Sequence, residues 1–99
     1  MHPNMIARSS GELGVGGDQL IYTGSNLVTN MTLRSGTTAS LLAVKDGSTI
    51  KWSISLIATT AAGDQVHSVA FPGGIKLGSN LTVTVSGTGA LAYVAFKPH

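Results

Sequence analysis

Cysteine is absent from this chain of 99 residues, and its absence excludes disulfide bonds and thiolate metal ligands. Charged residues are scarce as well, because they make up 10% of the chain, against roughly 25% in an average soluble protein. The six lysine and arginine residues stand singly and form no basic run. Since nucleic-acid binding depends on a concentrated positive surface, we expect no nucleic-acid partner.

A membrane-spanning segment is not expected either. Residues 77–96 carry no charge over a length that nominally spans a membrane. However, glycine, serine, asparagine and threonine interrupt this stretch repeatedly, and its apolar residues alternate with hydroxyl side chains. The pattern predicts a β-hairpin, and we expect no membrane partner.

The chain is rich in hydroxyl and aliphatic side chains where an average protein has charged ones. Serine and threonine together number 22, glycine numbers 13, and only five residues of the hydrophobic 42% are aromatic. Charged residues are the ones depleted from the cores of protein interfaces, so a surface with few of them costs little to desolvate on association. This composition favours a small domain with a thin core that packs against other proteins.

Short apolar runs alternate with turn residues from Asp18 onward, at the spacing of about eight to twelve residues that is typical of β-sandwiches and barrels. The sequence therefore predicts an all-β fold, a small antiparallel β-sandwich of the jelly-roll or immunoglobulin-like kind with about seven strands. The expected strands are residues 19–23, 27–34, 39–45, 48–58, 65–71, 80–86 and 90–97, with a short edge piece at 75–77.

The first seventeen residues show neither a strand nor a helix period and end in a glycine-rich stretch, residues 11–17. We interpret residues 1–17 as an extended N-terminal arm with a flexible hinge. Residues 18–99 then form the sandwich domain.

Alternation within single strands predicts which side chains share a face. In residues 27–34 one face is expected to carry Leu27, Thr29, Met31 and Leu33. In residues 80–86 the inward set is expected to be Leu81, Val83 and Val85.

Glycine and proline predict the turns. Asp46-Gly47 stands between two apolar runs and predicts a hairpin with a type I′ turn, whose twist matches that of the strands. Residues 72–74, Pro-Gly-Gly, predict the end of the strand that begins at residue 65.

The titratable residues form no recognisable catalytic or metal-binding pattern. Metal sites need three or four converging donors, and glycosidases need two facing carboxylates, whereas the three histidines and four carboxylates here are dispersed. Asp64 and His67 are three residues apart and favour a local surface pair, although a pocket that joined them would revive a small hydrolase. The glycines of residues 11–17 lack the Lys-Ser/Thr pair of a phosphate loop. We expect no enzyme, no catalytic residue, no metal and no cofactor.

Several segments together resemble one family. Residues 71–77, 80–87 and 90–96 look like the C-terminal half of small β-sandwich accessory proteins of tailed-phage virions, cyanophages included, and residues 21–25 are similar to their first strand. The resemblance implies a capsid decoration (cement) protein that binds the outer surface of the phage head and stabilises it. It further implies a homotrimer located on the virion, with the major capsid protein or other virion subunits as partners.

Two segments are the expected contacts with those partners. An N-terminal arm would lie on a neighbouring subunit, and the last strand is apolar on both faces, as in strands that are central or lie at an interface. The candidate interaction residues are Met5, Ile6, Leu13, Val15, Ala92, Val94 and Phe96.

A carbohydrate-binding or adhesion module, as on a phage fibre or a cell-surface protein, is the alternative. Trp52 would be its stacking platform if the indole were exposed. Its neighbours in phase, Ile50, Ile54 and Leu56, are all aliphatic and favour a place in the core.

Overall fold

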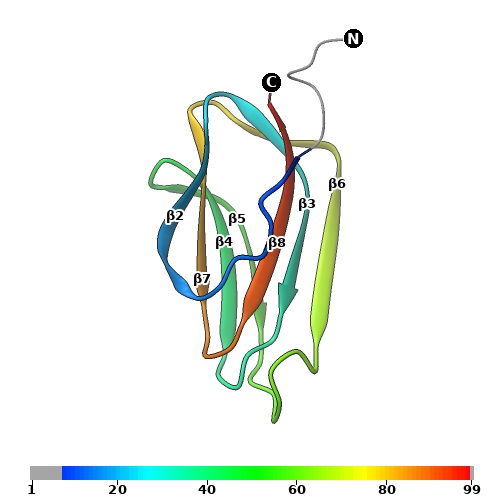
Figure 1. Cartoon of the computed structure of the whole chain (residues 1–99). Helices are drawn as coiled ribbons and strands as arrows, with labels where there is room; N and C mark the ends of the chain where they lie inside the picture. Colours follow the sequence, from blue (N-terminus) through cyan, green and yellow to red (C-terminus); the bar gives the residue numbers. More distant parts are fainter. Residues whose placement is uncertain (1–7, 99) are drawn as a thin grey trace.

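The structure is a computed structural model and describes residues 8–98, which fold into eight β-strands (Figure 1). The strands are Arg8–Ser9 (β1), Gly16–Thr23 (β2), Asn26–Arg34 (β3), Ser40–Asp46 (β4), Thr49–Leu56 (β5), Val66–Leu77 (β6), Asn80–Ser86 (β7) and Leu91–Pro98 (β8). Among these residues there is no helix long and apolar enough to cross a membrane.

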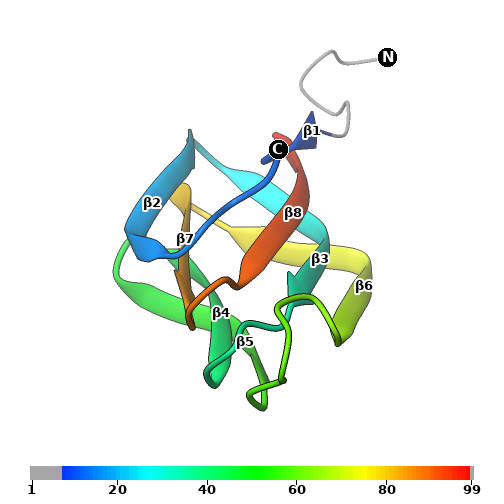
Figure 2. The same ribbon diagram turned by 60° about the horizontal axis from the view of Figure 1, so that its bottom comes forward.

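The strands form two antiparallel sheets of four that pack face to face (Figures 1 and 2). The first sheet has the order β1-β8-β3-β6, and the second sheet has the order β2-β7-β4-β5. Each strand of the first half pairs with its counterpart from the end of the chain, so that β1 pairs β8, β2 pairs β7, β3 pairs β6 and β4 pairs β5. This is the winding of an eight-stranded jelly roll. The predicted all-β sandwich is confirmed, with eight strands rather than about seven.

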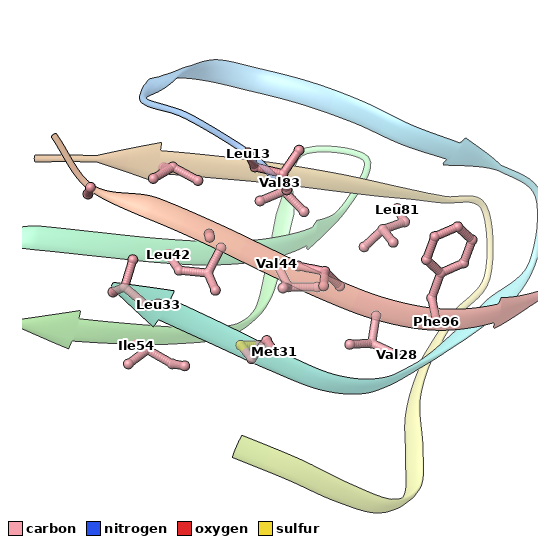
Figure 3. Packing of buried hydrophobic residues seen from close by; sticks show 14 of the residues in the cluster. Leu13, Val28, Met31, Leu33, Leu42, Val44, Ile54, Leu81, Val83 and Phe96 are labelled. Atoms are coloured by element: carbon pink, nitrogen blue, oxygen red, sulfur yellow. The ribbon is translucent and has the colours of Figure 1, made fainter. Parts of the chain in front are cut away.

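The core lies between the sheets and consists almost entirely of aliphatic side chains (Figure 3). β7 contributes Leu81, Val83 and Val85, which are all fully buried, as the alternation in residues 80–86 predicted. At about 25 cal/mol per Å² of apolar surface, burial of such side chains supplies the main favourable term of folding.

A bulge in β3 corrects the predicted facing of that strand. The pairing register shifts between Val28 and Asn30 with both neighbours, β6 and β8. One extra residue reverses the alternation, so Val28, Met31 and Leu33 point into the core while Leu27 is only half-buried. The single predicted face that joined Leu27 to Leu33 therefore does not form.

β6 continues through the proline and glycines that were expected to end it. The strand runs from Val66 to Leu77, and its register against β3 shifts in the interval that contains residues 71–74. Gly73 and Gly74 have φ angles of 84° and 80°, which glycine adopts without steric cost. They form an irregularity within one strand instead of a stop, and the separate edge piece at 75–77 belongs to β6.

The hairpin predicted at Asp46-Gly47 is confirmed, but its turn is different. Asp46 pairs with Thr49, so the two central residues are Gly47 and Ser48. Only Gly47 has a positive φ, 64°, which is the pattern of a type II′ turn with glycine first. Asp46 is consequently the last residue of β4, and its side chain is available to a neighbouring turn.

Residues 77–96 do not form the predicted hairpin. β7 belongs to the second sheet and β8 to the first, so the connection between them crosses from one layer to the other (Figure 2). Only β4 and β5 are successive strands of one sheet. Local alternation predicts strands but does not distinguish a hairpin from a crossing, because both need a short turn.

The described part of the predicted arm, residues 8–17, is built into the sandwich. β1 pairs with β8, and the backbone of Leu13 exchanges hydrogen bonds of 2.8 and 2.9 Å with Ala92. Gly16 already pairs with Val85. The expected boundary between residues 17 and 18 therefore falls inside β2, because the strands on both sides satisfy the backbone groups of this segment.

Candidate interaction surfaces

The structure assigns most of the predicted contact residues to the core. Ala92, Val94 and Phe96 face the opposite sheet and are at most 4% exposed, and Leu13 is 7% exposed. They are therefore corrected from contact residues to core residues, because this face of β8 packs into the core between the two sheets.

The remaining predicted contact residues are Val15, Met5 and Ile6. Val15 is 54% exposed and lies between Leu13 and the start of β2. Met5 and Ile6 lie outside the described residues. Of the predicted set, only Val15 is observed on the surface.

Five partly buried apolar side chains gather on one side of the sandwich, where the edges of the two sheets meet. We call this the β5–β6 side: it consists of Trp52 and Leu56 from β5 and Val69, Phe71 and Ile75 from β6. The rings of Trp52 and Phe71 join the two layers edge to face, with 5.2 Å between centroids. Apolar side chains rather than backbone pairing thus cover the core here.

Two further apolar residues stand at the same end of β5 and β6. Ile57 follows the last residue of β5 and is 71% exposed, and Val66 begins β6 and is also mostly exposed. Large exposed aliphatic residues beside a half-buried apolar cluster are typical of surfaces that contact other proteins.

The outer face of the second sheet is a separate surface with few charges. One row of side chains crosses its four strands, from Leu20 through Thr82 and Lys45 to Ile50, as the pairing registers show. Leu20 and Ile50, at the two ends of the row, are 62% and 58% exposed. This face therefore carries Leu20 and Ile50 on its outer strands, and hydroxyls together with Lys45 and the half-buried Leu41 on its middle strands.

The charges on this face neutralise each other. The Lys45 ammonium lies 2.8 Å from the Asp18 carboxylate, which also accepts a hydrogen bond from the Thr84 hydroxyl. These hydrogen bonds, that of Lys45 first, lower the pKa of Asp18. A paired charge of this kind costs less to cover than an isolated one.

At one end of the sandwich, Asp46 fastens the β4–β5 turn to the β6–β7 turn. Its carboxylate accepts hydrogen bonds from the backbone N–H groups of Gly78, Ser79 and Asn80 at 3.0, 3.2 and 3.2 Å. In return the Asn80 side chain accepts the Gly47 N–H at 2.8 Å. The backbone donors, that of Gly78 first, lower the pKa of Asp46 below its usual 3.8.

We expect Asp46 to make the stability of the domain pH-dependent. A carboxylate whose pKa is lower in the folded than in the unfolded state stabilises the fold above the unfolded pKa and loses this effect as the pH falls through the folded pKa. Thermal unfolding below pH 4 should therefore occur at falling temperature in the wild type. Asp46→Asn should unfold at lower temperature at neutral pH and lose less on acidification, while Asp64→Asn, in the exposed loop before β6, serves as control. Parallel curves for Asp46→Asn and wild type would contradict this role.

The outer face of the first sheet carries polar side chains. The Tyr93 hydroxyl donates to the Glu12 carboxylate at 2.9 Å, and this bond raises the pKa of Tyr93. Thr32 and Ser68 share a hydrogen bond of 2.9 Å on the neighbouring strands. These contacts fasten β8 to the segment between β1 and β2, and β3 to β6.

Asp64 and His67 form neither an ion pair nor a shared pocket. The one ion pair within residues 8–98 joins Lys45 to Asp18, and no pocket is found on this part of the molecule. The described residues also hold no group of three or more His, Asp or Glu placed to bind a metal.

The prediction that Ile50 shares the core face with Trp52 is wrong, because Ile50 is 58% exposed. Sequence reasoning also missed the exposed residues Leu20, Ile57 and Val66. Their exposure depends on the bulges in β2 and between β4 and β5, and on which strands form sheet edges.

Comparison with protein-family models, with curated proteins and with solved structures found no match.

Proposed function

We propose that this protein is a structural virion protein that binds the outer surface of a tailed-phage head and stabilises it, as a capsid decoration protein does. The observation that carries the proposal is the outer face of the second sheet, which presents Leu20 and Ile50 around a self-neutralised charge pair. Many copies that bury such a face against the capsid stabilise the particle by mass action.

The fold and the composition support this proposal. Jelly rolls with two Greek keys are common in viral capsid and lectin domains. Charged residues make up 10% of the chain, which keeps the cost of desolvating its surface low.

We expect Leu20→Lys to weaken binding to phage heads. Burial of one leucine contributes about 1.5–3 kcal/mol, so its loss should raise the Kd at least about tenfold. Ala70→Lys, on the outer face of the first sheet, is the matched control because it adds the same charge to an exposed strand position. Binding is measured by cosedimentation with heads that lack the protein, and equal affinity of Leu20→Lys and wild type would refute this contact surface.

A deletion tests the contribution of the arm. Removal of residues 1–17 would take away β1 and the buried Leu13, so the loss of binding would reflect a damaged fold. Removal of residues 1–7 spares both and takes away Met5 and Ile6. We propose that this shorter deletion lowers occupancy on the particle, and unchanged occupancy would limit the contact to the sandwich.

Sugar binding remains the second candidate because Trp52 is only half-buried. Stacking on a sugar needs a free ring face, and the edge contact with Phe71 leaves part of the indole accessible. Trp52 is the only tryptophan, so its fluorescence reports directly on this position. A saturable change on titration with oligosaccharides, without binding to heads, would favour the adhesion module over the decoration protein.

A further inference from the structure

We propose that two copies of this chain pair through the free edges of β5, antiparallel across a two-fold axis that passes by Ser53. The pairing would join two second sheets into one sheet of eight strands and cover the β5–β6 side of both copies. It goes beyond the proposed binding to a phage head and does not depend on it.

Among the edge strands within residues 8–98, β5 is the one of more than two residues that contains no proline or glycine. Within residues 8–98 it pairs only with β4, so its other edge presents unpaired backbone groups. Natural edge strands are shielded by shortness, bulges, proline or charged side chains, lysine above all. β1 has two residues, β2 has two register shifts and two glycines, and β6 contains Pro72 and two glycines. β5 has eight residues without proline or glycine; its register shift against β4 and its lysine both fall at Lys51, so residues 52–56 are regular.

The sequence of β5 is complementary to itself in this register. With Ser53 opposite the Ser53 of the second copy, Trp52 lies opposite Ile54 and Lys51 opposite Ser55. Apolar side chains then meet on the inner face, and the two lysines do not oppose each other, which would be unfavourable. An axis at Trp52 would instead bring two indoles together where each already contacts Phe71.

The two sides of the sandwich are closed in different ways, and only one is complete. On the β1–β2 side, residues 8–13 run along β8, Leu13 is buried, and the rings of Tyr22 and Phe96 lie 5.5 Å apart. On the β5–β6 side no segment within residues 8–98 takes that place, and the cluster around Trp52 and Phe71 is half-buried. A second copy supplies the same apolar cluster from the other side of the axis.

The size of this side is sufficient for a specific interface. Eight residues at about 3.4 Å each extend roughly 27 Å, and the shortest dimension of the molecule is 18 Å. Contact over this side by both copies amounts to about 1,000 Å², the lower limit for specific interfaces. The result is a dimer, whereas the resemblance to virion accessory proteins implies a trimer.

Sedimentation velocity of the full chain at increasing concentration tests the oligomeric state. We expect a monomer–dimer equilibrium that Ser53→Lys abolishes, because it sets like charges opposite each other at the axis. Ser68→Lys, the same change on the exposed part of β6, should retain the dimer. A monomer at all concentrations, a trimer, or a dimer that survives Ser53→Lys would each overturn the pairing, while binding to heads would still be judged by the Leu20→Lys experiment.

A cysteine at the axis tests the register. Because the chain has no cysteine, Ser53→Cys introduces a single thiol. Directly opposite residues bring their Cβ atoms within about 4.5–5.5 Å, close to the distance that a disulfide spans. Under mild oxidation we expect Ser53→Cys to form a covalent dimer at least about tenfold faster than Ser68→Cys, because pairing raises the effective thiol concentration. Equal rates would overturn the register, and circular dichroism checks that both variants fold.

Discussion

Gly36→Ala should unfold the domain at a far lower temperature than the wild type. Gly36 is buried between β3 and β4, where this connection passes against the one between β7 and β8. A Cβ atom at this position would lie 2.3 Å from the backbone oxygen of Thr88 and 3.0 Å from the nitrogen of Ala90. Both are backbone atoms and cannot rotate away.

The backbone around Gly36 has little freedom to relax. The Gly36 N–H donates to the Ser40 hydroxyl at 2.8 Å, and the Thr37 N–H donates to the Thr88 carbonyl at 2.8 Å. Displacement of this connection would break these hydrogen bonds as well, of which the one to Ser40 is buried. We expect a loss of about 3 kcal/mol or more in the free energy of unfolding, which corresponds to a fall of roughly 12–24 °C in Tm.

Gly17→Ala is the matched control for Gly36→Ala. A Cβ at Gly17 meets no atom within 4 Å, and its φ is not positive. We expect it to be neutral or slightly stabilising, since alanine has less conformational freedom in the unfolded chain. If Gly36→Ala and Gly17→Ala unfold within about 4 °C of each other in thermal scans, a shift worth 1 kcal/mol, the close approach of the two connections is disproved.

Leu42→Ala should have the second large effect. Leu42 is fully buried on β4, opposite Ile54 of β5 and Val85 of β7, at the centre of the second sheet. Removal of a buried leucine costs about 3–5 kcal/mol, through lost transfer free energy and the cavity that remains. Urea unfolding at equilibrium measures this loss.

The adjacent residue provides the control for Leu42→Ala. Leu41 points to the outer face of the second sheet, opposite Ser55 and Ser86, and is half-buried. Leu41→Ala should cost about 1 kcal/mol, since only part of its apolar surface is withdrawn from water. Equal losses for the two variants would mean that the sheet does not present these neighbours to opposite sides.

The strands could be predicted from the sequence because alternation is a local property. The inward set in β7 follows from a period of two within seven residues, and the hairpin at Asp46-Gly47 from a local turn pattern. The facing of β3 could not be predicted in the same way. Its bulge at Val28 arises from pairing with β6 and β8, which are distant in sequence.

The contact surfaces were also harder to predict from the sequence, because they depend on how strands distant in sequence are arranged. An apolar run such as residues 91–96 looks alike whether the opposite sheet or a partner protein covers its faces. Only the strand order shows that β8 is central and β5 is an edge, which transfers the expected contacts from Ala92 and Phe96 to Leu20 and the β5–β6 side. The aliphatic neighbours of Trp52 predicted a place in the core. In the structure Trp52 is partly buried and packs against the core from the β5–β6 side.

The central claim is that this domain acts through surfaces that it buries against other protein copies, beginning with its own. Amide hydrogen exchange of the β5 backbone at low and high protein concentration tests it most directly, because unpaired edge amides exchange fast and paired ones slowly. If β5 pairs with a second copy, protection of residues 49–56 rises with concentration while that of the β2 edge does not. Exchange in β5 that is independent of concentration would contradict it.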